Sequence, residues 1–149
     1  MLKGIDHRLN ADVLYTLRAM GHGDYLIISD TNFPADSIAS ETRAGELIRM
    51  ENLTAAEAIN AILSVMPLDT FVDDFAGRMR VGDDPDDIPA VQQEVIAEVQ
   101  ATGESRAIED IDRFAFYDLA KGAYAVIQTG ERRFYGCFML RKGVIPPEE

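Results

Sequence analysis

One histidine stands in a glycine-rich turn directly before a short apolar segment, and an aspartate follows that segment. His22 lies between Gly21 and Gly23, the apolar segment covers residues 25–29, and Asp30 comes next. Glycines on both sides let the backbone turn sharply and expose the ring. Imidazole is the side chain whose ordinary pKa lies closest to neutrality, which suits a general acid or base. The sequence therefore offers His22 as a candidate for proton transfer, with an ordinary polar loop residue as the alternative.

Asp30 stands where the apolar segment, read as a strand, would end. Residues at the carboxyl ends of strands often contact ligands in α/β sheets. An ionised carboxylate accepts several hydrogen bonds, so Asp30 could orient the His22 imidazole or bind a hydroxyl group directly. The same side chain could instead close an Asx turn ahead of Asn32, a structural role that needs no ligand.

Two further groups of candidates lie in the last third of the chain. Arg113 could hold sugar or carboxylate oxygens with its forked donors, and Tyr117, about one helical turn further on, is a supporting candidate. A surface ion pair for the arginine and core packing for the tyrosine are the alternatives. Tyr135, Gly136 and Cys137 open a predicted strand, where the glycine would let a ligand approach the backbone closely. The apolar residues that follow favour a packed Cys137 thiol over a nucleophile.

An acidic run at residues 83–87 is the remaining candidate for binding, here of a divalent cation. Its spacing differs from that of an EF-hand loop, and its charge and proline favour a solvated loop. The chain has no phosphate-binding loop, no dinucleotide fingerprint, no paired metal-binding histidines and no Gly-x-Ser-x-Gly elbow. The motifs therefore indicate neither a metal nor a cofactor.

Predicted helices and strands alternate along the chain and would position these residues. The apolar spacing over residues 10–20 predicts a helix, and the continuous apolar run 25–29 predicts a strand that is covered on both faces. Thr54 and Glu57 have the form of a capping box at the start of a helix that ends before Pro67. Such alternation predicts an α/β layered domain.

Weaker signals predict the other elements. Strands are expected at residues 47–50, 75–81, 123–128 and 134–140, helices at 89–100 and 113–120, loops at 31–37 and 82–87, and a polar tail at 146–149. Asp112 is the expected cap of the last helix. A turn at residues 129–131 would let the final strand pair with the strand before it.

Composition narrows the classes of function. The 149 residues, 47% of them hydrophobic, suffice for one compact domain over residues 1–149. A formal net charge of −12 repels phosphate backbones and anionic lipids, so we expect no nucleic-acid partner and no membrane partner. The first residues lack the apolar core of a secretion signal, and a lone cysteine fits a reducing compartment. We therefore expect a cytoplasmic protein.

Five segments together resemble the RbsD/FucU sugar mutarotase family, which includes fucose mutarotase and ribose pyranase. The matching segments, in the order of that family, are Met20–Asp24, Ser29–Asp30 with Phe33–Ala35, Arg113–Tyr117, Thr129–Glu131 with Tyr135–Gly136, and Lys142–Val144. Several motifs in the right order are much more specific than any one alone, and together they span nearly the whole chain. The resemblance implies an RbsD-like α/β fold, a single layered domain with a mixed sheet and helices on both faces.

The resemblance also implies an activity: a cofactor-free isomerase that interconverts the anomers of a reducing monosaccharide. His22 aligns with the catalytic histidine of the family, and Asp30, Arg113 and residues 135–137 align with positions that contact the sugar. Mutarotation needs one proton delivered to the ring oxygen and another taken from the anomeric hydroxyl, and His22 can serve one of these transfers. Family members resemble ring-shaped homo-oligomers, typically decamers, with sites near subunit boundaries.

Single positions within the resemblance bear on the substrate. Arg113 resembles the fucose branch, which implies a fucose-like pyranose. That branch typically has asparagine in place of Cys137 and histidine in place of Asn32. The alternatives are a non-catalytic monosaccharide-binding or transport-accessory protein, an enzyme for another polyol or sugar acid, and a structural subunit of an assembly.

Overall fold

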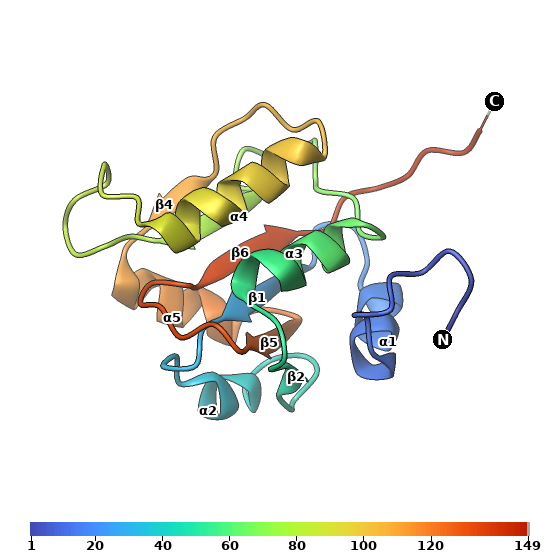
Figure 1. Ribbon diagram of the computed structural model, residues 1–149, viewed down its shortest axis with the longest axis horizontal. Coiled ribbons are helices and arrows are strands. Elements are labelled where there is room, and N and C mark those ends of the chain that lie inside the picture. The colour runs from blue at the N-terminus through green and yellow to red at the C-terminus, as the bar shows by residue number, and fades with distance from the viewer. Residues whose placement is uncertain (149) are drawn as a thin grey trace.

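The computed structural model describes residues 1–148, and its centre is a six-stranded sheet (Figure 1). The strands are β1 (Tyr25–Ser29), β2 (Ile48–Met50), β3 (Ala76–Met79), β4 (Glu109–Ile111), β5 (Ala125–Thr129) and β6 (Phe138–Arg141). Their order in space is β2-β5-β1-β6-β3-β4. β6 runs antiparallel to both of its neighbours, whereas the other neighbouring strands are parallel. The predicted mixed sheet is thus confirmed.

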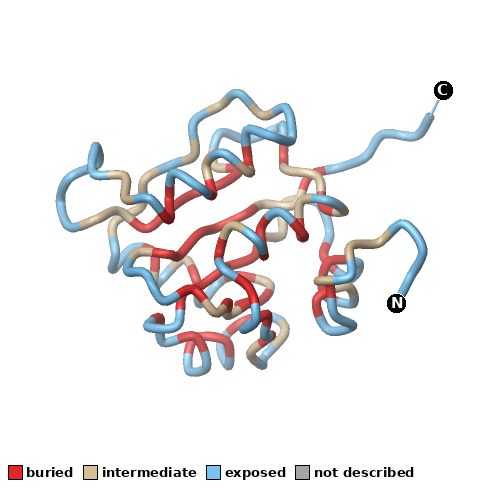
Figure 2. Tube along the Cα trace, viewed as in Figure 1, coloured by how far each residue is buried: buried red, intermediate tan, exposed pale blue. Residues whose placement is uncertain are grey.

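Within residues 1–148, helices cover both faces of this sheet, as predicted. They are α1 (Ala11–Ala19), α2 (Ala35–Ala39), α3 (Ala55–Leu63), α4 (Ala90–Ala101) and α5 (Arg113–Lys121). Successive side chains of a strand point to opposite faces, so Leu26 and Ile28 of β1 pack with α1, α3 and α4, and Ile27 packs with α2 and α5. Figure 2 shows buried residues running through the sheet and the inner sides of the helices. None of these helices is long and apolar enough to cross a membrane.

Side-chain caps fix the starts of three predicted helices. Asn10 accepts a hydrogen bond from the N–H of Val13 at the start of α1. Thr54 and Glu57 make both bonds of the predicted capping box at α3. Asp112 accepts two N–H bonds from the first turn of α5. Each cap satisfies N–H groups that have no partner within the helix. The predicted capping box and the predicted Asp112 cap are confirmed.

The predicted loop over residues 31–37 is wrong at its end, because α2 begins at Ala35. Pro34 precedes this helix and lies at its cap position. A proline there keeps its fixed φ and forfeits no intrahelical hydrogen bond. The proline therefore marks the start of a short helix.

The predicted pairing of the last two strands is also wrong. The final strand begins at Phe138, four residues later than expected, and pairs with β1 and β3, whereas β5 pairs with β1 and β2. Tyr135 has a φ of 62°, a left-handed conformation that a ladder strand does not use. The chain thus turns across the end of β1 before it enters the sheet. β4 was not predicted, since three residues with two acids show no apolar alternation.

The topology separates the candidate residues between two edges of the sheet. Because only β6 is antiparallel, its beginning lies at the edge where the other five strands end. This carboxyl edge holds Asp30, Arg113 and Tyr135, while His22 lies before β1 at the opposite edge. A five-residue strand is about 17 Å long. Within one chain, Asp30 therefore does not orient His22, and that prediction is wrong. Glu149 of the predicted polar tail lies outside the described residues.

Candidate functional site

A pocket of about 240 Å³ opens at the carboxyl edge of the sheet. Its lining residues are Asp30, Asn32, Phe33, Met79, Arg113, Tyr117, Phe134, Tyr135 and Cys137. The end of β1, the first two turns of α5 and the loop before β6 thus bring five of the predicted site residues together. Other grooves in the described residues are larger, and two of them, of about 430 and 660 Å³, border Pro67 and hold none of the predicted site residues.

Asp30 forms the buried wall of this pocket. One of its carboxylate oxygens accepts the N–H groups of Asn32 and Phe33, both at 2.9 Å, and the other accepts the N–H of Gly136 at 3.1 Å. The predicted Asx turn is therefore confirmed. A carboxylate has about four acceptor positions, so three N–H bonds leave one position on Oδ2 that could accept a ligand hydroxyl.

Arg113 and Tyr117 stand together on the rim. The Nε of Arg113 donates to the Tyr117 hydroxyl at 3.0 Å, and the guanidinium carbon lies 5.5 Å from the centre of the Tyr117 ring. That bond fixes the plane of the guanidinium. Within the described residues its two terminal nitrogens have no hydrogen-bond acceptor, so they are available to oxygens of a ligand.

Gln92, which the sequence analysis did not select, supports the wall of the pocket from within the core. Its fully buried amide donates to the carbonyls of Met79 at 2.7 Å and Tyr135 at 3.0 Å, and it accepts a bond from Arg78 at 2.9 Å. These bonds join two backbone segments of the wall and stabilise the left-handed Tyr135. The sequence signal that could have found Gln92 is its place as a polar residue on the otherwise apolar buried face of α4.

Gly136 differs from its predicted role, because protein side chains rather than a ligand occupy the space beside it. A Cβ at this position would lie 2.8 Å from Cγ of Glu131 and 3.3 Å from Cβ of Asp30. The missing side chain therefore lets the loop before β6 close over Asp30 and donate the N–H of Gly136 to its carboxylate.

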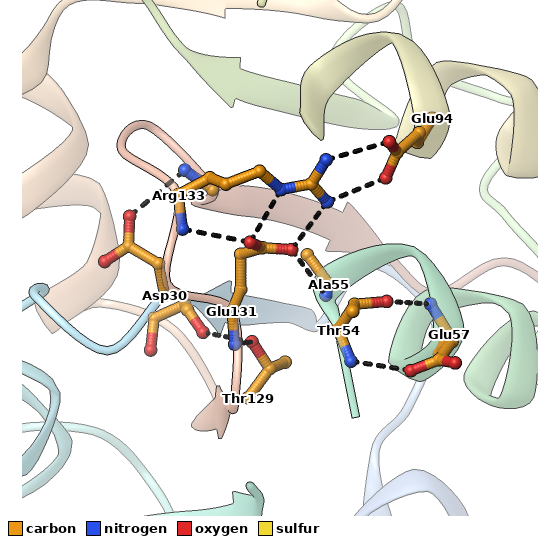
Figure 3. A network of polar contacts seen from close by, with 10 residues as sticks. Asp30, Thr54, Ala55, Glu57, Glu94, Thr129, Glu131 and Arg133 are labelled. Carbon is orange, nitrogen blue, oxygen red and sulfur yellow. Dashed lines mark hydrogen bonds and ion pairs between the residues drawn. The ribbon is translucent and has the colours of Figure 1, made fainter. Parts of the chain in front are cut away.

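An ion-pair network secures the same loop (Figure 3). Arg133 donates to Glu131 at 2.9 Å and, with two nitrogens at 2.8 Å, to Glu94 of α4. Glu131 is buried and also accepts the backbone N–H of Arg133. The Arg133 guanidinium holds the pKa of Glu131 at about 2, against the opposing effect of burial. This network ties the pocket loop to α4.

We expect Glu131→Gln to destabilise the fold at neutral pH and to flatten its acid dependence. A carboxyl whose pKa falls from 4.5 to about 2 on folding stabilises the protein above pH 4.5, and that contribution disappears as the pH falls towards 2. It is on the order of 2–3 kcal/mol. Urea unfolding between pH 7 and pH 3 measures it. Glu51→Gln, which removes an exposed ion pair with Arg49, is the control and should change the free energy of unfolding little. If that free energy depends on pH in the same way in Glu131→Gln and in the natural protein, Glu131 does not have a lowered pKa.

Cys137 is a packed thiol, as the sequence favoured. It is buried in the apolar cluster beneath α2 and α5. Burial raises the pKa of the thiol well above its ordinary value, and the neighbouring Asp30 carboxylate raises it further. Since the thiolate is the nucleophilic form, the burial of Cys137 favours a packed thiol over a nucleophile.

The native protein should therefore react very slowly with a thiol reagent such as 5,5′-dithiobis-(2-nitrobenzoic acid) at pH 8. In guanidinium chloride the same thiol should react at the rate of a model peptide, because unfolding exposes it. Absorbance at 412 nm follows both reactions. The unfolded protein should release the equivalent of one thiol per chain, which shows that its reaction is complete. Rapid reaction of the native protein would show that the pocket exposes a thiolate.

His22 pairs with Asp69 at the opposite edge of the sheet. The Nε2 atom lies 3.1 Å from both carboxylate oxygens, and the side chains are 44% and 2% exposed, respectively. Burial raises the pKa of Asp69, but hydrogen bonds from the Phe71 N–H and from His22 outweigh it and lower that pKa below its ordinary value. A buried, ionised carboxylate can orient an imidazole and stabilise its protonated form. Asp69 was missed because 47 residues separate it from His22 and no motif surrounds it.

The acidic run at residues 83–87 is an exposed loop, and Asp84 caps the N–H of Asp86 within it. Within residues 1–148, no three His, Cys, Asp or Glu side chains gather as a set of metal ligands.

In mixed α/β sheets, a pocket at the carboxyl ends of the strands is a common place for small molecules to bind. The chain belongs to the RbsD / FucU transport protein family, whose model matches residues 3–145. The family predicted from the five motifs is confirmed.

Relatives that are 36–40% identical to this chain are named fucose mutarotases. The fucose mutarotase of Danio rerio is 40% identical, over 100% of this chain and 97% of that protein. The crystal structure of the fucose mutarotase from Streptococcus pneumoniae in complex with L-fucose is 36% identical, with a TM-score of 0.87 over 97% of this chain and 100% of that one. The crystal structure of protein Atu2016 is 58% identical, with a TM-score of 0.95 over 98% and 97%.

Proposed function

We propose that this protein is a cofactor-free mutarotase that interconverts the anomers of a fucose-like monosaccharide. The observation that carries the proposal is the convergence of Asp30, Arg113 and Tyr117 on one pocket in a chain whose relatives are named fucose mutarotases. A cytoplasmic location and the absence of nucleic-acid and membrane partners stay predictions.

The size and lining of the pocket support a single sugar ring. Its volume of about 240 Å³ lies below the roughly 300–1,000 Å³ typical of sites for drug-sized ligands. Asp30 offers an acceptor to a hydroxyl, and Arg113 offers donors. Phe33 and Met79 add apolar surface, which suits the methyl group of a 6-deoxy sugar because a hydroxymethyl group there would lose hydrogen bonds to water.

The reaction needs only proton transfers and positioning. A protonated group gives a proton to the ring oxygen while a base takes the proton of the anomeric hydroxyl, and the bond from the anomeric carbon to the ring oxygen breaks. The open-chain aldehyde rotates about its first carbon–carbon bond and recloses as the other anomer. His22 serves one of the two transfers, and Asp69 positions it; Tyr135 or a water molecule could serve the other.

His22 and the pocket lie at opposite edges of one chain, so we propose that two copies build each site. Exposed aromatic side chains support this: Phe71 beside His22 is 70% exposed, and Phe114 and Phe134 beside the pocket are 69% and 74% exposed. Exposed apolar groups of this kind mark contact surfaces. A contact between two unlike edges repeats from copy to copy, and it forms a ring when the rotation between copies closes. A closed ring is the form that agrees with the decameric ring that the family resemblance implies.

Saturation-transfer NMR on sugars at anomeric equilibrium tests the function. We expect the protein to accelerate exchange between the anomers of L-fucose and to act much less on D-ribose. L-Galactose is the matched control for the apolar lining of the pocket, because it differs from L-fucose by a hydroxyl in place of one hydrogen of the C6 methyl group.

The second candidate is a non-catalytic sugar-binding protein, which Asn32 and Cys137 favour because the fucose branch typically has other residues there. Such a protein would be stabilised against heat by its sugar yet leave the anomer exchange rate unchanged. Thermal shift with the same three sugars separates the two candidates, and a lack of both effects would refute the proposed function.

A further inference from the structure

We propose that the Arg141–Gly143 segment, at the end of β6, sets the spacing between His22 and Asp69 and so acts as a positioning element for this pair. The inference deepens the proposed function and rests on the proton-transfer role of His22. The sequence motif at residues 142–144 had no assigned role.

The backbone of this segment is hydrogen-bonded on both sides. On one side the Lys142 carbonyl accepts the N–H of Gly23 at 2.9 Å, and the N–H of Lys142 donates to the carbonyl of Asp24 at 2.8 Å. On the other side the Arg141 carbonyl accepts the N–H of Asp69 at 3.0 Å, and Gly143 donates to Pro67 at 2.8 Å. The turn that carries His22 and the segment that carries Asp69 are therefore both attached to the same three residues.

The two cationic side chains of the segment strengthen the attachment to the His22 turn. Lys142 Nζ donates to the carbonyls of Leu17 and Met20, just before the turn. Arg141 donates to the carbonyl of Gly23 at 2.9 Å, just after His22. Carbonyls on both sides of His22 are thus fixed, which limits how far the turn can move.

Gly143 sets the distance on the Asp69 side. A Cβ at this position would lie 2.4 Å from the carbonyl oxygen of Leu68 and 2.9 Å from Cα of Asp69. These are backbone atoms, which cannot swing aside as the tip of a side chain can. A methyl group at residue 143 would therefore push the Asp69 segment away from β6.

The contact between His22 and Asp69 has little tolerance for such a shift. Its two distances are 3.1 Å, near the upper end of the usual range for hydrogen bonds. A displacement of about 1 Å would break the contact, and a misplacement of that size can cost about 10²-fold in rate.

A spectroscopic test reads the pair without relying on activity. In ¹⁵N-labelled protein we expect Gly143→Ala to move the ring-nitrogen signals of His22 in the same direction as Asp69→Asn does. His7, the other histidine and an exposed one, is the internal control and should not move. Unchanged His22 signals in folded Gly143→Ala would overturn the inference.

Kinetics give the second readout. We expect Gly143→Ala to lower kcat for L-fucose by about 10- to 100-fold with KM changed less than threefold, and to have little further effect in the Asp69→Asn background. Gly82→Ala is the control, since it strains a positive φ of 53° in the acidic loop without a clash. An equal loss of kcat in both backgrounds would show that Gly143 acts through general stability, against the inference.

A second variant covers failure of Gly143→Ala to fold. Lys142→Met keeps the length of the side chain and removes its bonds to Leu17 and Met20, so it should move the His22 signals while His7 stays in place; unchanged His22 signals count against the inference. If the His22 signals move as expected but the natural protein accelerates no sugar, the positioning role holds and the proposed function fails.

Discussion

His22→Ala should lower the rate of L-fucose anomer exchange at saturating sugar by about 10²- to 10⁴-fold, the usual contribution of general acid–base catalysis. The side chain is half-exposed, and Asp69 keeps its hydrogen bond from the N–H of Phe71 when the imidazole is removed, so the fold should persist. Because His22→Ala leaves Asp30 and Arg113 of the pocket unchanged, the stabilisation by L-fucose in thermal shift should change little.

Exchange NMR and thermal shift on the same samples separate these two effects. His7→Ala is the matched control, since it removes the other imidazole from an exposed position near the N-terminus. Retention of more than a tenth of the natural rate by His22→Ala would assign the proton transfers to other groups, of which Tyr135 is the first to examine.

Local signals account for the parts of the fold that the sequence predicted. Asn10, Thr54 and Asp112 cap helices within a few residues of themselves, and the continuous apolar run of β1 is typical of a buried strand. The course of the chain before β6 depends instead on the Glu131–Arg133–Glu94 network and the left-handed Tyr135. Such contacts depend on the fold, so local patterns cannot predict them.

The same distinction holds for the site. The end of a predicted strand made Asp30 a candidate, and the family resemblance supported Arg113; the structure brings both side chains to one pocket. Asp69 and Gln92 act through contacts across many residues and have no motif of their own. The predicted link between His22 and Asp30 was wrong because the strand that connects them in sequence also holds them apart.

Because His22 and the pocket lie at opposite edges of one chain, we expect activity to be restored when two differently damaged variants are mixed. His22→Ala leaves the pocket intact, and Arg113→Ala leaves the His22 edge intact while it lowers kcat/KM by about 10- to 100-fold through loss of charged hydrogen bonds. If each site uses the pocket of one copy and His22 of the next, a mixed ring contains some sites with both parts intact. With equal random mixing, about one quarter of the sites are complete, since two positions must each hold the right variant.

Co-expression of the two variants with different tags, followed by purification on both tags, isolates the mixed rings. We expect kcat/KM for L-fucose to rise from the low average of the separate variants to about one quarter of the natural value. The control is a mixture of His22→Ala with Asp69→Ala, which damages the same edge in every copy and should give only the average. No gain from the first mixture would mean that both parts come from one chain, which β1 could allow only if the His22 turn moved across the length of the sheet. Since residues 141–143 hold that turn by backbone and side-chain bonds, we expect the gain.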